Sequence, residues 1–395
     1  MAQGTGWDVI VLGAGAAGLL CAGEAGRRGR RVLVVDHLAQ PGAKLRVSGG
    51  GRGNVTNRHL DRTHYLSEHP GFCTAALRRF GAGDLLHRLA QAGIAVEERE
   101  GGQYFCVGAA QQVVTLLMDG CAAGRVAFSL GAAVQQVERV AGGFVLQTGA
   151  GRLWGAALVV ATGGLSFPKL GATDLGHRLA RQWGLPVVEP RPGLVPLLLP
   201  RTGFWQADSL AGVVVEASVQ CRKVRFTGPL LFTHRGVSGP VVLQISSHWR
   251  TGEPLRIDLL PTVDLGQVFR QARQLRARQE VVTVLADHLP RRLAQAVARQ
   301  VGIGGRVAEL PDARLRQLAE AVHHWVVIPA GTEGYRTAEV TVGGVDTAAL
   351  SPRTMECRTM PGLYFVGEVM DVTGQLGGYN LQWAWSSGFV AGQSV

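Results

Sequence analysis

A glycine-rich turn near the N-terminus constrains this sequence more than any other feature. Gly13, Gly15 and Gly18 form the pattern G-x-G-x-x-G between an apolar segment, Asp8 to Leu12, and a run of small residues. The first glycine permits a tight turn, the second lets the backbone approach a pyrophosphate, and the third allows close packing of a helix. The N-terminus of that helix would offer oriented N–H groups to the phosphates. The pattern therefore predicts a dinucleotide-binding βαβ unit.

A carboxylate completes this unit. A second apolar segment, Arg31 to Val35, follows the predicted helix and ends at Asp36. A carboxylate about 20 residues after the glycines accepts hydrogen bonds from ribose hydroxyls and disfavours a 2′-phosphate. A glycine-rich turn in an ordinary βαβ unit is the alternative interpretation, but it would not require Asp36. We therefore expect the bound nucleotide to contain an adenosine without a 2′-phosphate.

A second glycine-rich segment distinguishes FAD from NAD as the occupant. Lys44 to Asn57 combines four glycines with Ser48, Arg52 and Asn54. Such a loop is suited to following an extended ribityl and pyrophosphate chain. A flexible surface loop is the alternative, although such loops rarely combine so many donors.

A third segment lies near the C-terminus. Leu363 to Val366 is an apolar strand that leads into Gly367-Glu368, and Gly377-Gly378 open a final helix that extends to about Gly392. The first N–H groups of that helix would face the pyrimidine edge of a flavin, where negative charge develops on reduction. The three segments together predict non-covalently bound FAD.

The rest of the chain suggests more than one domain. A chain of 395 residues, 46% of them hydrophobic, can bury a large core and suggests two or three domains. The proline-rich segment Pro190 to Pro200 is typical of a domain crossing. Beyond it, Val213 to Val219 and Leu255 to Leu259 predict strands, and Leu265 to about His324 is helical in pattern. Residues from about Tyr65 to Gly93 are also predicted to be helical.

The formal charge of +11 raises the possibility of a nucleic-acid partner. The arginines are dispersed along predicted helices, for example Arg270 to Arg278 and Arg291 to Arg299, with no basic block that alternates with aromatic residues. We therefore expect a solvated surface or a field that steers an anionic ligand, and no nucleic-acid partner.

The sequence also argues against several other classes of protein. No apolar stretch approaches the roughly 18 residues that span a bilayer, so we expect a cytoplasmic protein without membrane contact. None of the six cysteines lies two, three or four residues from another, which argues against zinc ligation and against a redox-active disulfide. No metal site is expected.

Longer motifs resemble one family. The sequence is similar to the BaiN-type NAD(P)/FAD-dependent oxidoreductases of bacteria, a family that also contains aminoacetone oxidase. The resemblance covers nearly the whole chain and rests on VSGGGRGNVTN (Val47 to Asn57), ATGGLSFPKLGATDLGHRLA (Ala161 to Ala180), LLFTHRGVSGP (Leu230 to Pro240), AEVTVGGV (Ala338 to Val345) and GLYFVGEVMDVTGQLGGYNLQWAWSSG (Gly362 to Gly388).

The resemblance implies an α/β fold. It consists of a glutathione-reductase-like, Rossmann-type FAD-binding domain with an inserted β-barrel-like substrate domain and a small helical domain. The expected bounds are 1–189 and 337–395 for the FAD-binding domain, 190–262 and 325–336 for the β domain, and 263–324 for the helical part.

The resemblance also implies a set of cofactor contacts. They fall on Gly13, Gly15, Gly18, Asp36, Lys44, Ser48, Gly49, Arg52, Asn54, Thr162, Gly163, Gly367, Glu368, Asp371, Gly378 and Asn380, with Val134 as a backbone contact on the adenine side. Neighbouring positions of the same motifs complete the set: Ala16, Ala17, Gly50, Gly53, Gly164, Gly377 and Tyr379. Many relatives have cysteine where this chain has Gly53, which puts any mechanism with a flavin-adjacent thiol in doubt.

These features predict an FAD-dependent oxidoreductase of a small molecule, either an NAD(P)H-dependent reductase or an oxidase of a small amine. No second nucleotide motif is visible, because Gly302 to Gly305 follows a helical pattern rather than a strand; NAD(P)H would therefore visit only transiently. His234 is a candidate acid or base, and a surface histidine is the alternative. A non-catalytic flavin sensor or an RNA-modification scaffold is the other functional class. We expect a monomer or a homodimer.

Overall fold

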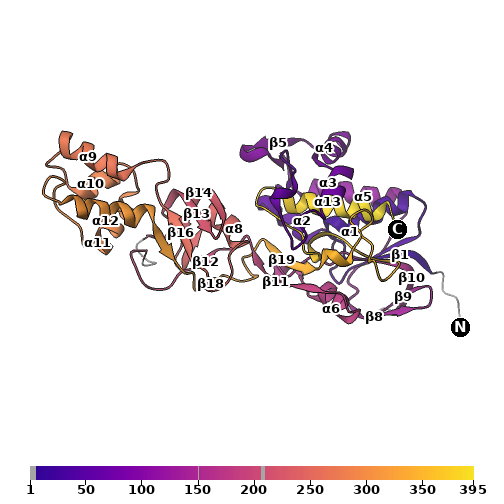
Figure 1. Cartoon of the computed structure of the whole chain (residues 1–395). Coiled ribbons are helices and arrows are strands. Elements are labelled where there is room, and N and C mark those ends of the chain that lie inside the picture. The colour runs from indigo at the N-terminus through magenta and orange to yellow at the C-terminus, as the bar shows by residue number, and fades with distance from the viewer. Residues whose placement is uncertain (1–5, 150, 206–209) are drawn as a thin grey trace. The chain divides into compact units, whose positions relative to one another are not determined.

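A computed structural model describes residues 6–149, 151–205 and 210–395 (Figure 1). The chain divides into two compact units. The first comprises Met1–Arg191 and Val340–Val395, and the second comprises Pro192–Glu339. Each unit has its own cluster of buried apolar side chains.

The first unit is built around a sheet with parallel strands at its centre. The strand β1 (Trp7–Leu12) pairs in parallel with β2 (Val32–Val35) and β10 (Gly151–Val160). On either side, β7 (Ala127–Ser129) pairs with β2, and β20 (Leu363–Phe365) pairs with β10. The apolar runs of β1 and β2 are buried on both faces, as a parallel sheet between helices requires.

The strand β10 joins two kinds of pairing. Its first half pairs antiparallel with β9 (Gly143–Thr148), which in turn pairs with β8 (Val134–Val140). Its second half lies parallel to β1 and ends beside the glycine-rich turn. The long strand therefore brings Ala161 and the residues after it to the same edge of the sheet as Gly13.

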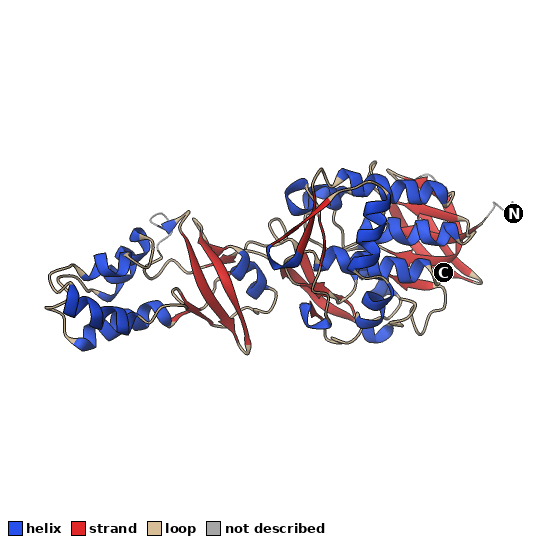
Figure 2. Ribbon diagram, turned by 90° about the horizontal axis from the view of Figure 1, so that it is seen from above, coloured by secondary structure: helices blue, strands red, loops and turns tan. Residues whose placement is uncertain are grey.

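Helices cover the sheet (Figure 2). The helix α1 (Ala16–Arg27) packs against α5 (Gln111–Ala123) and α13 (Tyr379–Gly392). Glycines allow this close packing, because a Cβ at Gly26 would lie 2.4 Å from the carbonyl oxygen of Gly124 and one at Gly388 would lie 2.4 Å from that of Ala17.

The remaining elements of the first unit are shorter. They are α2 (Ala43–Val47), α3 (Thr74–Arg79), α4 (Ala82–Gln91), α6 (Leu175–Gln182), the sheet of β3 (Asn54–Asn57), β6 (Gln103–Cys106) and β5 (Val96–Arg99), the pair β4 (Tyr65–Leu66) and β21 (Thr373–Gly374), and the pair β11 (Val187–Gly193) and β19 (Val340–Val345). The predicted helix over residues 65–93 is wrong in its first part. Tyr65 and Leu66 form a strand, and helix begins only at Thr74.

The second unit combines one sheet with a layer of helices. Its strands follow the order β17 (Trp325–Val327), β16 (Leu255–Asp258), β13 (Val214–Cys221), β14 (Val224–Phe232), β15 (Gly236–Ser238), β12 (Leu197–Leu198) and β18 (Gly331–Thr332). Its helices are α8 (Pro240–Ser246), α9 (Leu265–Leu275), α10 (Val281–Ala286), α11 (Arg291–Val301) and α12 (Asp312–His323). The prediction that Gly302 to Gly305 is a helix break is confirmed, because Gly302 ends α11 in a left-handed conformation.

Candidate cofactor site

The glycine-rich turn leaves open space in front of α1. A Cβ at Gly13 would lie 2.4 Å from the carbonyl oxygen of Ala161, and one at Gly18 would lie 2.0 Å from that of Gly13, so both positions require glycine for packing. Gly15 differs, because a Cβ there would meet nothing within 4 Å. No side chain caps α1. Its first N–H groups, including those of Ala16 and Ala17, are therefore placed as a bound phosphate requires.

Asp36 lies at the end of β2 beside this turn. Its carboxylate accepts hydrogen bonds from the backbone N–H groups of Ala14 (2.7 Å) and Leu38 (2.8 Å). Its own carbonyl accepts from the N–H of Ala132 (2.9 Å), two residues before Val134. The structure therefore brings together the turn, the carboxylate and the segment expected to contact adenine.

Thr162, Gly163 and Gly164 follow β10 at the same edge. Gly163 has a φ of 72°, and a Cβ there would meet nothing within 4 Å, so it borders open space as Gly15 does. Gly164 is packed, because its Cβ would lie 2.4 Å from Thr341 Oγ1. The Thr162 hydroxyl is buried without a hydrogen-bond partner among the described residues and lies beside Gly176 on α6.

A polar cluster joins three distant segments. Lys44 Nζ donates to Ser166 Oγ (2.6 Å) and to Glu368 Oε2 (2.5 Å). The other oxygen of Glu368 accepts from the N–H of Thr341 (2.8 Å). The Phe167 ring lies 5.6 Å from the ammonium group and has a left-handed backbone (φ 58°), a conformation that is strained for a non-glycine residue. Lys44 and Glu368 were expected from separate motifs; the structure places them in contact.

The loop from Ser48 to Asn54 is held by its own backbone. Gly49, Gly50 and Gly53 have φ values of 55°, 66° and 69°, and the N–H of Gly53 donates to the carbonyl of Ser48 (2.9 Å). Asn54 Nδ2 donates to Gln103 Oε1 (2.7 Å), and its Oδ1 is buried without a partner among the described residues.

The Ser48 hydroxyl donates to the carbonyl of Leu45 (2.7 Å). The Arg52 side chain is mostly exposed and lies 3.9 Å from Glu97. Neither side chain is therefore oriented by a contact with the cluster around Lys44.

Several predicted residues have structural partners of their own. Asn380 accepts from the N–H of Gly374 and donates to its carbonyl (both 2.8 Å), so its amide holds this loop. A Cβ at Gly378 would lie 2.4 Å from the carbonyl oxygen of Thr56, so this glycine packs against β3. The Tyr379 ring stacks on His64 at 4.6 Å.

Gly367 lies against the first turn of α1, because a Cβ at this position would lie 3.0 Å from Ala17 Cβ. Gly377 has a φ of 120°, and its nearest neighbours are Gln103 and Asn57, while Gly367 donates its N–H to Ser387 Oγ (3.0 Å). In the second unit, His234 is exposed in the turn between β14 and β15.

The sequence interpretation did not single out Ser166, Phe167 or Thr341. All three lie inside motifs that it quoted. The Ser-Phe-Pro run after the Gly-Gly pair was the available signal, because a bulky residue before proline is restricted in conformation.

The residues at the edge of the sheet fit a dinucleotide. Gly15 and Gly163 border space that a side chain would fill, and the uncapped N-terminus of α1 opens into the space at Gly15. The carboxylate of Asp36 lies beside the glycine-rich turn and accepts from the N–H of Ala14. This arrangement of residues suits an extended ligand whose middle part is anionic.

Asp371 lies in a different environment. Its buried carboxylate accepts from the N–H of Glu68 (2.8 Å). Burial raises the pKa of Asp371 above its ordinary value of 3.8, and the charge of Asp346 acts in the same direction. The folded protein therefore keeps a proton at a pH where the unfolded chain has released it, so stability falls as pH rises from 3.8 through the raised pKa.

Asparagine at position 371 has no such proton to lose. We therefore expect the melting temperature of Asp371→Asn minus that of the wild type to increase as pH rises from about 4 to about 7. Melting curves of both proteins across this range provide the measurement. A difference in melting temperature that does not change with pH would contradict the prediction.

All six cysteines are free and buried. Burial raises the pKa of Cys73 to about 11 and that of Cys121 to about 12, so these thiols stay protonated at neutral pH.

Among the described residues, no group of three histidine, cysteine or acidic side chains could hold a metal ion. The described helices are also too short or too polar to cross a membrane.

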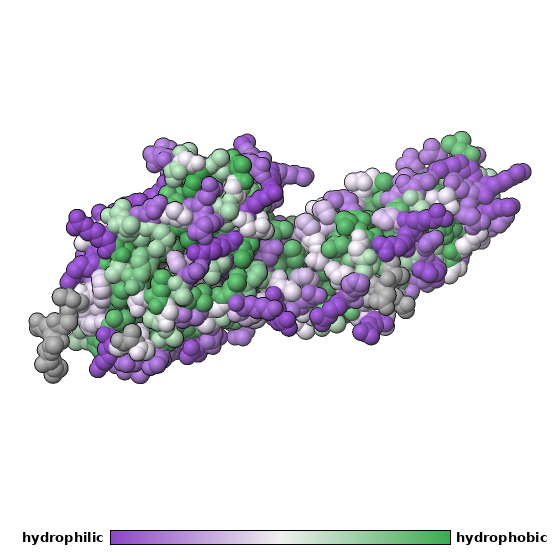
Figure 3. Space-filling view, turned by 180° about the vertical axis from the view of Figure 1, so that it is seen from behind, coloured by the Kyte–Doolittle hydropathy of each residue, from purple (hydrophilic) through white to green (hydrophobic). Residues whose placement is uncertain are grey.

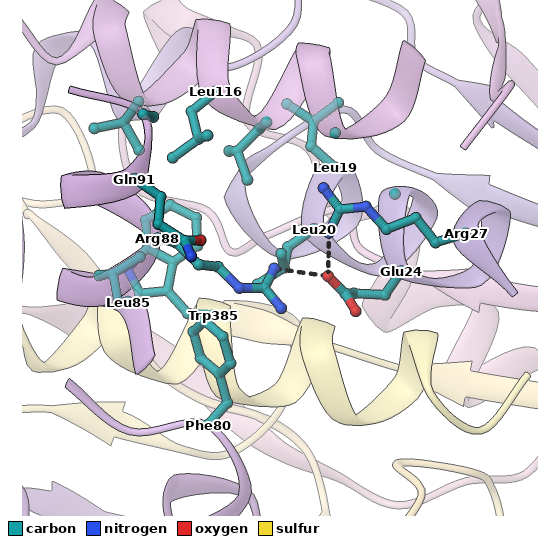
Figure 4. Close-up of a pocket in the computed structure, with 15 residues that line it drawn as sticks. Leu19, Leu20, Glu24, Arg27, Phe80, Leu85, Arg88, Gln91, Leu116 and Trp385 are labelled. Atoms are coloured by element: carbon teal, nitrogen blue, oxygen red, sulfur yellow. Dashed lines mark hydrogen bonds and ion pairs between the residues drawn. The ribbon is translucent and has the colours of Figure 1, made fainter. Parts of the chain in front are cut away.

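A separate cavity of about 430 Å³ lies along α1 (Figure 4). Apolar residues of α1, α4 and α5 line it, together with Phe80 and Trp385. At its polar side, the buried Glu24 accepts from Arg27 (3.0 Å), Arg88 (2.6 Å) and Gln393 (2.8 Å). The cavity faces the later turns of α1, whereas the dinucleotide space lies at the first turn.

Comparison with known proteins agrees with this fold. A ribosomal RNA dihydrouridine synthase of Escherichia coli is 47% identical over 98% of both chains, and its counterpart in Haemophilus influenzae is 44% identical over 98% of both. A 3-dehydro-bile acid delta(4,6)-reductase of Clostridium scindens is 32% identical over 98% of both. A solved 3-ketosteroid delta1-dehydrogenase of Sterolibacterium denitrificans, 14% identical, aligns over 99% of both chains with a TM-score of 0.51, which supports the fold.

The family model described as the HI0933-like protein Rossmann domain matches residues 7–394. The predicted resemblance and the α/β Rossmann-type fold are thereby confirmed. The chain belongs to the HI0933-like family of Rossmann-fold proteins, a family of flavin-dependent oxidoreductases.

Proposed function

We propose that this chain reduces a uridine of ribosomal RNA to dihydrouridine. The observation that carries the proposal is the 47% identity to the Escherichia coli synthase over 98% of both chains, so that both units take part in the match. The expectation of a small-molecule substrate and no nucleic acid conflicts with the names of two relatives. The net charge of +11, attributed above to a solvated surface, is also suited to a polyanionic substrate.

Dihydrouridine forms when the C5–C6 double bond of uracil gains a hydride and a proton. A reduced flavin supplies a hydride when it is bound, and NAD(P)H is the proposed source of the two electrons. We assign FAD, held without a covalent bond, to the space at Gly15 and Gly163. The N-terminus of α1 would bind the pyrophosphate, and Asp36 would bind the ribose.

The cluster of Lys44, Ser166 and Glu368 borders this site. Its hydrogen bonds fix the ammonium group between a hydroxyl and a carboxylate, so that the positive charge is held in one place. Because the carboxylate neutralises the ammonium charge, the cluster offers fixed hydrogen-bonding groups rather than net charge, and these need no reorganisation at the moment of reaction. The cluster would therefore position the cofactor and the redox-active ring.

Reduction of a small conjugated ketone is the second candidate, because the bile acid reductase is 32% identical over 98% of both chains. Both relatives' names describe reduction of ring double bonds, and the two substrates differ mainly in size and charge. The long polyanion is favoured because the identity to the RNA-acting relatives is higher.

The test combines the purified protein, NADPH and unmodified ribosomal RNA transcribed in vitro. We expect dihydrouridine in the nucleosides after digestion, measured by mass spectrometry, and none in reactions without NADPH. A parallel reaction contains a conjugated steroid ketone in place of RNA. Absence of dihydrouridine together with reduction of the ketone would replace the proposal with the second candidate.

A further inference from the structure

One face of α11 carries only arginine and glutamine. The exposed positions of this helix are Arg291, Arg292, Gln295, Arg299 and Gln300, and the opposite face buries apolar side chains such as Leu293 and Val297. The helix contains no acidic residue. Arg291, Gln295 and Arg299 are spaced four residues apart, so they form one stripe about 12 Å long. We refer to these three residues as the α11 stripe.

Most carboxylates of the neighbouring helices have partners other than the stripe, and Glu280, at the start of α10, forms no ion pair with Arg291 or Arg299 within the described residues. Each of the following is engaged elsewhere: Asp312 with Arg273, Asp287 with Arg276 (2.6 Å), Glu309 with Arg306 (3.7 Å), Glu320 with His324 (3.7 Å), and Asp264 with the N–H of Gln267 (3.1 Å). The side chains of Arg291 and Arg299 have no ion pair or hydrogen bond within the described parts of the chain. Their charge therefore faces solvent.

The C-terminal end of α11 is also covered by positive charge. The carbonyls there carry the negative end of the helix dipole, which would repel an anion. Arg314 from α12 donates to the carbonyls of Gly302 (2.6 Å) and Val301 (3.4 Å). This contact offsets the negative end, so that an anion meets positive charge along the whole stripe.

The composition of this face indicates what kind of partner it fits. The core of a protein interface is enriched in aromatic residues and methionine as well as arginine, and a helix that lies in a membrane surface has an exposed apolar face. The exposed positions of α11 provide no aromatic residue, no methionine and no apolar face. Figure 3 likewise shows mainly hydrophilic residues over the helical end of the second unit. Arginine and glutamine are instead suited to phosphate oxygens and sugar hydroxyls.

From these observations, the structure assigns the α11 stripe as a surface that binds the phosphate backbone of ribosomal RNA. This assignment rests on the proposed function and adds the place where RNA docks outside the cofactor site. Contacts of this kind give affinity and salt dependence without base specificity.

The test is a charge reversal with a matched control. Arg291→Glu with Arg299→Glu changes the net charge by four. Arg139→Glu with Arg152→Glu makes the same change on exposed residues of β8 and β10, whose side chains form no ion pair or hydrogen bond with other described residues. Binding of in vitro transcribed ribosomal RNA is measured by filter binding at several salt concentrations. Melting temperature and the rate of NADPH oxidation confirm that each variant is folded.

We expect the α11 reversal to weaken RNA binding about 10-fold or more and the control to change it less than about 3-fold. The slope of log affinity against log salt should fall by about 1.4 to 1.8 for two lost phosphate contacts. Equal losses in both variants, or no loss in the α11 variant, would overturn the assignment. Dihydrouridine formation by the wild type is measured separately. If either of these two outcomes is found and the wild type still forms dihydrouridine, the proposed function stands and only the docking surface is rejected. Absence of any wild-type RNA binding would overturn both.

Discussion

Replacing Gly15 with valine is expected to abolish FAD binding while leaving the protein folded. A Cβ at this position would meet no protein atom within 4 Å, so the polypeptide has room for the new side chain. In the proposed site, the pyrophosphate contacts the backbone in this same space, at the N-terminus of α1. The flavin content of the purified variant, measured by absorbance after acid release, should fall at least about 100-fold, because the side chain excludes the ligand rather than weakening one contact.

Gly83→Val is the matched control. A Cβ at Gly83 also meets nothing within 4 Å, and Gly83 lies in α4, away from the glycine-rich turn. This variant should keep stoichiometric FAD and lose no stability, because valine has a higher helix propensity than glycine. Full FAD content in a folded Gly15→Val protein would show that the pyrophosphate lies elsewhere.

Glu24→Ala is expected to lower the free energy of unfolding by about 2 to 4 kcal/mol, since it leaves a guanidinium without its partner beside an apolar cavity. The Glu24 side chain is 6% exposed and that of Arg88 is 29% exposed, so solvent compensates only in part. The Arg88 guanidinium also lies 4.9 Å from the ring centre of Phe80, a contact that holds it in the cavity wall after the carboxylate is gone.

Arg27→Ala is the comparison, because this arginine contacts the same carboxylate but is 47% exposed. It should cost less than about 1 kcal/mol, as exposed ion pairs do. Urea unfolding followed by circular dichroism measures both variants. Equal destabilisation by the two substitutions would contradict the importance assigned to burial of the Glu24–Arg88 pair.

Local chemistry made parts of this fold predictable. The βαβ unit follows from buried apolar strands and a glycine turn, and α13 begins directly after the Gly377-Gly378 pair, as expected. The strand β4 was not predictable in this way. Tyr65 and Leu66 are extended because they pair with Thr373 and Gly374, which are distant in sequence, and no local pattern reports that contact.

The same distinction between local patterns and contacts of distant segments applies to the candidate site. Motif spacing singled out Gly15 and Asp36, and the family resemblance singled out Lys44; their roles as cofactor contacts stay predictions. The contact between Lys44 and Glu368, which are 324 residues apart, depends on how the two segments fold together. Asn380 and Asp371 carry suitable side chains, but the structure gives them other partners. Asn380 bonds to Gly374 nearby in the chain, and Asp371 bonds to Glu68, which is 303 residues away.

The pairing of β11 with β19 has a consequence for how such proteins diversify. The chain leaves the first unit along β11 and returns along β19, and the two strands are neighbours in one small sheet. Neighbouring strands lie about 5 Å apart. A segment of nearly 150 residues is thus bounded by two junctions that almost touch, a geometry that tolerates exchange of everything between them. Recombination at two adjacent joints therefore replaces the second unit as a whole and leaves the sheet and the glycine-rich turn of the first unit unchanged.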